Sequence, residues 1–130
     1  MATTTHKLTL EQQRAQNAWA CAQQSGVGDE YKNLAKSLPA LIMNSGLLQV
    51  MAFLHEKGSK PKQVHCKLMG EHLRAWLNQR YGDQVPKDFG RCMAALMAAK
   101  PAHFQAVTQE AFDWLRWLRQ VVPAVVDGGV

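Results

Sequence analysis

The clearest helical pattern in the chain lies in residues 108–122, which read TQEAFDWLRWLRQVV. Apolar side chains recur there every three or four residues, which is the spacing of one face of an α-helix. They are Ala111, Leu115, Leu118 and Val122. Trp114 and Trp117 widen this face, so we expect the helix to lie at the centre of the fold, with Trp114 and Leu118 largely buried.

Both ends of this segment carry residues that are typical of helix boundaries. Thr108 is a suitable N-cap, and Glu110 then falls in the first turn, where the helix dipole favours an acid. Pro123 disfavours continuation, so we predict that the helix ends there. Residues 124–130, like residues 1–8 at the other end, are expected to be frayed.

The rest of the chain repeats the same pattern with short breaks. Thr9 and Gln12 form a capping-box pair at the start of the first helix, and Asp29 is predicted to cap the second. Pro39 suits the first turn of a new short segment. Breaks at Asn44–Gly46, Gly58–Pro61, Gly82 and Lys100–Pro101 delimit the remaining helices, the longest over residues 62–81, with another opened by Pro86–Asp88. The sequence therefore predicts an all-α fold, a single compact bundle of about six to seven helices.

Composition agrees with an all-α fold and excludes several other classes. The 130 residues suffice for one domain over 1–130, and 47% hydrophobic residues are too many for a disordered chain. There are 17 Ala and 14 Leu but one Ile, so an all-β fold is excluded. The four tryptophans fall on or beside apolar stripes and are expected in the core: Trp19, Trp76, Trp114 and Trp117.

No apolar run is long enough to cross a membrane, and no secretory signal is visible, so a cytoplasmic location is expected. The three cysteines, Cys21, Cys66 and Cys92, show neither a CxxC pair nor a zinc-ligand spacing. We therefore expect buried free thiols in a reducing compartment.

No catalytic, metal or cofactor site is predicted. His65, Cys66 and His72 lie on one predicted helix, but His65 and His72 are seven residues apart, and helical zinc ligands are usually three or four apart. No nucleophile elbow, acid–base carboxylate pair or glycine-rich phosphate loop is present. The chain is therefore not expected to be an enzyme; a small enzyme with a His/Cys site remains an alternative.

The positive charge is concentrated, and it indicates an anionic partner. The net charge is +5, and four lysines fall within eleven residues: Lys57, Lys60, Lys62 and Lys67. Lys32 and Lys36 form a like-charge pair one helical turn apart, and Arg116 and Arg119 share one side of the last helix. No base-reading motif accompanies them, so any contact with nucleic acid would be to its backbone.

Several short motifs, in order, resemble a known family. They include YKNLAKSLPALI at 31–42, NSGL at 44–47, MAFL at 51–54 with Lys57, and TQEA at 108–111 followed by LRWLR at 115–119. Arg14-Ala15, Ala18-Trp19 and Trp76-Leu77 also fit. The chain resembles the small α-helical subunit of type III-B CRISPR (Cmr) RNA-targeting complexes over residues 14–122. Gln120 stands where that family usually has a second basic residue, and Met51 where Leu is usual.

The resemblance implies a non-catalytic subunit that lines a filament in antiviral defence. Its implied partners are CRISPR effector backbone subunits, other copies of itself, the target RNA and the CRISPR RNA. Together with the charge pattern, it implies RNA contacts from Lys57, Lys60, Lys62, Lys67, Lys32, Lys36, Arg119 and Arg116. Two alternatives stay open: a helical adaptor that binds only protein, and the small subunit of a type III-A complex.

Overall fold

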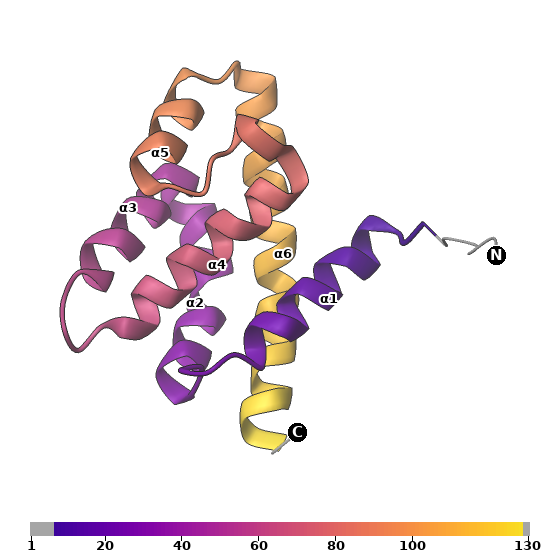
Figure 1. Ribbon diagram of the computed structural model, residues 1–130, viewed down its shortest axis with the longest axis vertical. Helices are drawn as coiled ribbons and strands as arrows, with labels where there is room; N and C mark the ends of the chain where they lie inside the picture. The colour runs from indigo at the N-terminus through magenta and orange to yellow at the C-terminus, as the bar shows by residue number, and fades with distance from the viewer. Residues whose placement is uncertain (1–6, 129–130) are drawn as a thin grey trace.

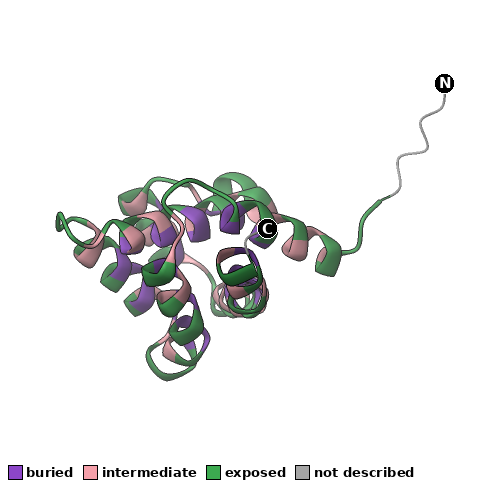
Figure 2. Cartoon of the chain, turned by 90° about the horizontal axis from the view of Figure 1, so that it is seen from below, coloured by how far each residue is buried: buried purple, intermediate pink, exposed green. Residues whose placement is uncertain are grey.

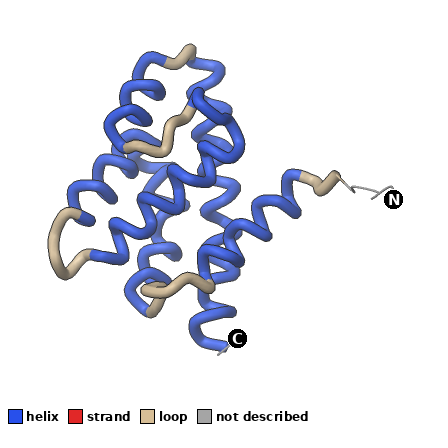
Figure 3. Tube along the Cα trace, viewed as in Figure 1, coloured by secondary structure: helices blue, strands red, loops and turns tan. Residues whose placement is uncertain are grey.

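The computed structural model describes residues 7–128, and every regular element within them is helical (Figures 1 and 3). The prediction of an all-α fold is confirmed. The elements follow in the order α1 (Leu10–Ala22), α2 (Asp29–Ser45), α3 (Leu47–Gly58), α4 (Val64–Tyr81), the 3-10 turn η1 (Gly82–Gln84), α5 (Phe89–Ala98) and α6 (Pro101–Gly128).

Local sequence signals set most of the helix ends. The Thr9 hydroxyl accepts from the Gln12 amide at 3.1 Å, and the Gln12 side chain accepts from the Thr9 amide at 2.8 Å, so the predicted capping box is present. Asp88 caps α5 by accepting from the Arg91 amide. Gly46, between α2 and α3, has a φ of 85°, a left-handed conformation that other residues rarely adopt. At α2, Gly28 rather than Asp29 occupies the N-cap position.

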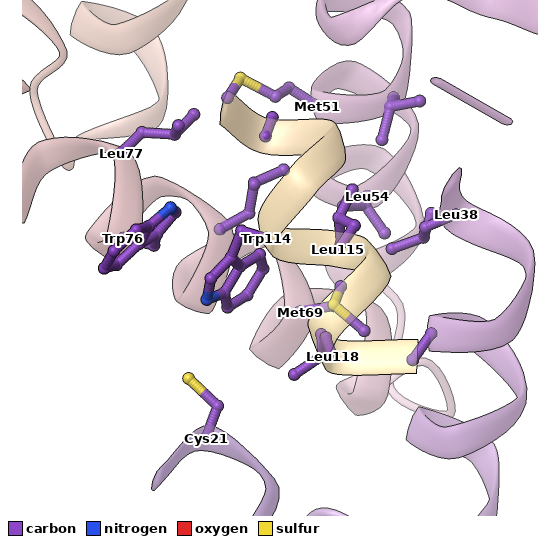
Figure 4. Close-up of a cluster of buried hydrophobic side chains, with 14 of the residues drawn as sticks. Cys21, Leu38, Met51, Leu54, Met69, Trp76, Leu77, Trp114, Leu115 and Leu118 are labelled. Carbon is purple, nitrogen blue, oxygen red and sulfur yellow. The ribbon is translucent and has the colours of Figure 1, made fainter. Parts of the chain in front are cut away.

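One hydrophobic core, with α6 at its centre, draws residues from all six α-helices. Trp114 and Leu118 of α6 are fully buried, as predicted, and Trp76 and Leu77 of α4 pack with them (Figure 4). Figure 2 shows the buried residues on the sides of the helices that face one another. Trp19 is an exception to the prediction, because it is 38% exposed on α1. Its neighbour Ala18 is the residue that faces the core there.

Helix α6 is longer at both ends than the sequence analysis predicted. It begins at Pro101, a favoured first position, whereas Thr108 lies inside the helix and donates its hydroxyl to the Phe104 carbonyl at 2.9 Å. It continues through Pro123 to Gly128, so residues 124–128 are helical; residues 129–130 lie outside the described part. Burial of Val125 against the core favours this continuation.

Helix α2 likewise continues through a proline. Pro39 was predicted to begin a new segment, but it lies inside α2 and is buried. Leu38 and Ile42, on either side of it, are both in the core. Packing of these side chains compensates for the backbone hydrogen bond that the proline cannot donate.

A buried carboxylate links α1 and α4 to α6. Glu110 is 3% exposed and accepts from Arg14 Nε at 2.7 Å and from Arg14 Nη2 at 2.8 Å. It also accepts from the Trp76 indole at 3.2 Å and from Arg80 Nε at 3.3 Å. Helix α1 packs mainly against α6, on the side away from α3 (Figure 1). The hydrogen bonds from Arg14 to Glu110 are therefore a main polar attachment of α1 to the rest of the molecule.

Within residues 7–128, no helix is both long enough and apolar enough to span a membrane.

Candidate nucleic-acid interface

Four of the predicted RNA-contacting lysines surround the loop between α3 and α4. Lys57 lies in the last turn of α3, Lys60 and Lys62 lie in the loop, and Lys67 lies in the first turn of α4. We call these four residues the loop cluster. Figure 1 shows this loop at one edge of the molecule. The structure therefore brings these four side chains to one end of the α3–α4 pair.

Most of the positive charge of the loop cluster is not neutralised by acids. Lys60 Nζ lies 2.9 Å from Glu56 Oε2, and this hydrogen bond, with the lysine charge, lowers the pKa of Glu56. Between residues 7 and 128, no carboxylate oxygen lies within 4 Å of the ammonium groups of Lys57, Lys62 and Lys67. Three lysines are thus available to an anionic partner.

The two predicted lysines on α2 differ in their surroundings. Lys32 Nζ lies 2.8 Å from Asp127 Oδ1 and 3.4 Å from Asp29 Oδ1. The hydrogen bond to Asp127 is the main reason why the pKa of Lys32 is raised. Lys36 is exposed and has no ion-pair partner in the part of the chain that the structure describes. Lys32 therefore joins α2 to the end of α6, and Lys36 alone presents an open charge.

Arg116 and Arg119 lie at a different place from the loop cluster. Both line an open groove of about 570 Å³ between α1 and α6, together with Arg14 and Trp117. Glu11 and Asp113 are also in the groove, and Asp113 lies 3.5 Å from Arg14. Because α1 and the α3–α4 loop are on opposite sides of α6 in Figure 1, the eight predicted residues do not form one continuous strip.

The His and Cys residues on α4 point to separate partners. His72 is buried; Tyr31 Oη lies 2.7 Å from its Nδ1 and Gln24 Oε1 lies 2.8 Å from its Nε2. Burial lowers the pKa of His72 to about 4, so its ring is neutral. His65 instead lies near Glu30, with 3.7 Å between Nδ1 and Oε2. In the described residues no three His, Cys, Asp or Glu side chains gather as metal ligands would.

All three cysteines are free and buried, as expected. Burial raises the pKa of each thiol, that of Cys21 to about 11. The thiolate is the reactive form of cysteine, and a raised pKa keeps the thiol protonated at neutral pH. These cysteines therefore serve as small core residues.

Comparison with known proteins assigns the chain to a family. Residues 10–125 match the model of a family described as CRISPR-associated protein (Cas_Cmr5). The chain belongs to this family. The Cmr5 family is the small-subunit family of type III-B that the sequence motifs indicated, so that resemblance is confirmed.

A relative and a solved structure support the assignment to the Cmr5 family. The protein named CRISPR system Cmr subunit Cmr5 from Thermus thermophilus is 26% identical over 122 residues, covering 92% of this chain and 97% of the relative. The crystal structure of a CRISPR-associated Cmr5 family protein from the same organism matches with a TM-score of 0.70 and 27% identity. It covers 92% of this chain and 99% of that chain.

Two clusters in this Cmr5-family chain were not predicted from the sequence. Glu110 was placed in the first turn of a helix, but it is buried within α6. Its burial could have been inferred from its position four residues before Trp114, which places it on the apolar face of the helix. The second cluster joins Arg74 of α4 to Phe89 of α5 and His55 of α3. These three residues lie on different helices, so no spacing along the sequence indicates that they meet, and only the packing of the helices shows the cluster.

Proposed function

We propose that this Cmr5-family chain is a non-catalytic small subunit of a cytoplasmic type III-B Cmr ribonucleoprotein, where it stabilises the guide–target RNA through the loop cluster. Its partners are the effector backbone subunits, further copies of itself, the target RNA and the CRISPR RNA. The observation that carries the RNA contact is the set of three lysines without an ion-pair partner among residues 7–128, Lys57, Lys62 and Lys67, at one exposed end of α3 and α4. The relative's name, a Cmr subunit, supports the assembly.

The chemistry of the candidate catalytic groups supports a non-catalytic role. The thiols have raised pKa values, and His72 is occupied by Tyr31 and Gln24. The most buried acid, Glu110, is fully engaged with its arginines and Trp76. None of these groups is both exposed and activated, which a nucleophile or general base requires.

The proposal is tested by reversing the charge of the loop cluster. The triple change Lys57→Glu, Lys60→Glu and Lys62→Glu should weaken binding of single-stranded target RNA by the assembled complex. Each phosphate contact on a single strand contributes about 0.7 to the slope of log affinity against log salt. Lys60 is already paired with Glu56, so the slope should fall by about 1.4, the value for two lost contacts.

A matched triple reversal controls for the change in net charge. Lys7, Arg91 and Lys100 are exposed and lie outside α3, α4 and the loop between them, so reversing them alters the charge equally without touching the loop cluster. This control should reduce affinity much less. Equal effects of the two triple variants would show only a general electrostatic attraction. An unchanged affinity and slope in the loop variant would refute the proposal and favour a protein-only adaptor.

A further inference from the structure

A small cavity lies between α3 and α4, beside the loop cluster. It has a volume of about 230 Å³, room for roughly seven waters or one phosphate group with its hydration. Lys67 and Arg74 line it with positive charge, and Ser59 and Glu71 add polar groups. Helices α3 and α4 approach closely at one end of the cavity. There a Cβ added to Gly58 would lie only 2.6 Å from the Lys67 Cα, so the absence of a side chain at Gly58 permits this approach.

Arg74 is held in place before any ligand arrives. Its Nε donates to the Lys87 carbonyl at 2.8 Å, and its Cζ lies 5.7 Å from the centre of the Phe89 ring. Its terminal nitrogens have no acceptor within the described residues, although the side chain lines the cavity. A guanidinium fixed through Nε, with free terminal nitrogens, is well suited to hydrogen-bond a phosphate.

Gly70 provides the space that this arginine occupies. A Cβ on Gly70 would lie 3.2 Å from Arg74 Nη1, so alanine at this position would displace the guanidinium by a few tenths of an ångström. Glycine in a helix interior lowers helix stability relative to alanine. Here it permits the observed position of Arg74.

An aromatic pair borders the same cavity. His55 is exposed, lines the cavity and stacks on Phe89 of α5, with ring centroids 3.8 Å apart and planes 3° from parallel. Figure 1 shows α3, α4 and α5 meeting on one side of the molecule, away from α1. A cation-lined cavity next to an exposed stacked ring matches the phosphate and the base of one nucleotide.

We propose that the cavity between α3 and α4 binds one phosphate of single-stranded RNA through Arg74 and Lys67, with the adjacent base stacked on His55. The site extends the loop cluster from Lys67 towards α5, and it rests on the proposed RNA-binding function. Glu71, which also lines the cavity, opposes the two cations and weakens the site.

Direct binding measurements on the full chain test the site. Anisotropy with a short end-labelled oligouridine should show that Arg74→Gln lowers affinity about tenfold, the loss of one charge-assisted phosphate contact. Gly70→Ala should lower affinity severalfold while the melting temperature stays equal or rises, because alanine favours the helix. Glu71→Gln should raise affinity at least twofold. Arg91→Gln, which removes the same charge outside the cavity, should change it less than twofold.

The base contact is separated from the phosphate contact with a second probe. His55→Ala should lower affinity for the oligouridine about fivefold or more. It should leave the amide NMR shifts that inorganic phosphate induces around Lys67 and Gly70 unchanged. Loss of the phosphate response in this variant would overturn the assignment of the two subsites.

The outcomes distinguish this site from the wider function. If the wild-type complex and the loop-cluster triple variant bind RNA alike, the proposed function itself fails. If the triple variant binds weakly but Arg74→Gln and Gly70→Ala bind as the wild type does, the function stands and the cavity is not an RNA site.

Discussion

Removing the buried carboxylate of Glu110 should loosen the attachment of α1. Glu110→Ala leaves Arg80 and the Trp76 indole without their acceptor, and it leaves Arg14 with only the more distant Asp113, 3.5 Å away. Breaking a buried ion pair costs about 3–5 kcal/mol. The Arg14 side chain is 17% exposed and can partly rehydrate, so we expect about 3 kcal/mol. That is a large share of the roughly 5–15 kcal/mol typical of a folded domain.

Urea unfolding at neutral pH measures this loss, and a double-mutant cycle isolates the pair. Arg14→Ala alone should cost a similar amount. The double variant should cost less than the sum of the two single variants by about 2 kcal/mol, the coupling expected of residues in direct contact. Arg119→Ala is the control, because Arg119 is exposed on α6, and it should change stability by less than about 0.5 kcal/mol.

The loss of stability in Glu110→Ala should be concentrated in α1 and should depend on pH. Relative to the wild type, Glu110→Ala should speed up hydrogen exchange at the amides of α1 more than at those of α4. Burial alone would raise the pKa of Glu110, but the hydrogen bond and charge of Arg14 outweigh it and lower the pKa. The pair should therefore stabilise the fold above the unfolded pKa of about 4.3 and lose this contribution as the pH falls below it. Additive single variants, or a cost below about 1 kcal/mol, would refute the account.

Two further predictions concern the core. Leu118→Ala should lower the free energy of unfolding by about 2–5 kcal/mol, because Leu118 is fully buried; a harmless substitution in urea unfolding would contradict its central place. His72 has a pKa of about 4 in the fold and about 6.5 when unfolded, so the unfolded state binds more protons between these values. Stability should fall by about 3 kcal/mol as the pH drops from 6.5 to 4. His72→Gln should remove that part of the pH dependence, and a wild-type curve that stays flat there would refute it.

The sequence alone predicted the all-α fold and much of its core, because those features are local. An apolar residue every three or four positions specifies a helix and the face that it buries, as Trp114 and Leu118 show. Thr9 and Gln12 satisfy each other's backbone groups within three residues, so this capping box was predicted without a structure.

Tertiary packing decided where α2 and α6 continue. Pro39 and Pro123 each remove one backbone hydrogen bond, and the sequence rule treats such a residue as a boundary. The burial of Leu38, Ile42 and Val125 outweighs that loss, and it depends on helices distant in sequence. The same holds for Glu110, whose buried carboxylate is stabilised by Arg14, 96 positions away in the sequence, and by Trp76 and Arg80 of α4.

The candidate interface divides in the same way. The loop cluster was visible because its lysines are close in sequence, and a short loop keeps them close in space. Asp29 lies three residues before Lys32 and could be recognised as a partner, but the shorter contact with Asp127 could not, since Asp127 approaches Lys32 only when α6 packs on α2. The cavity around Arg74 needed three helices to meet before the guanidinium had a fixed position. The sequence by itself therefore determined the helices, their apolar faces and the amount of positive charge, whereas tertiary packing decided which charges remain open to a ligand.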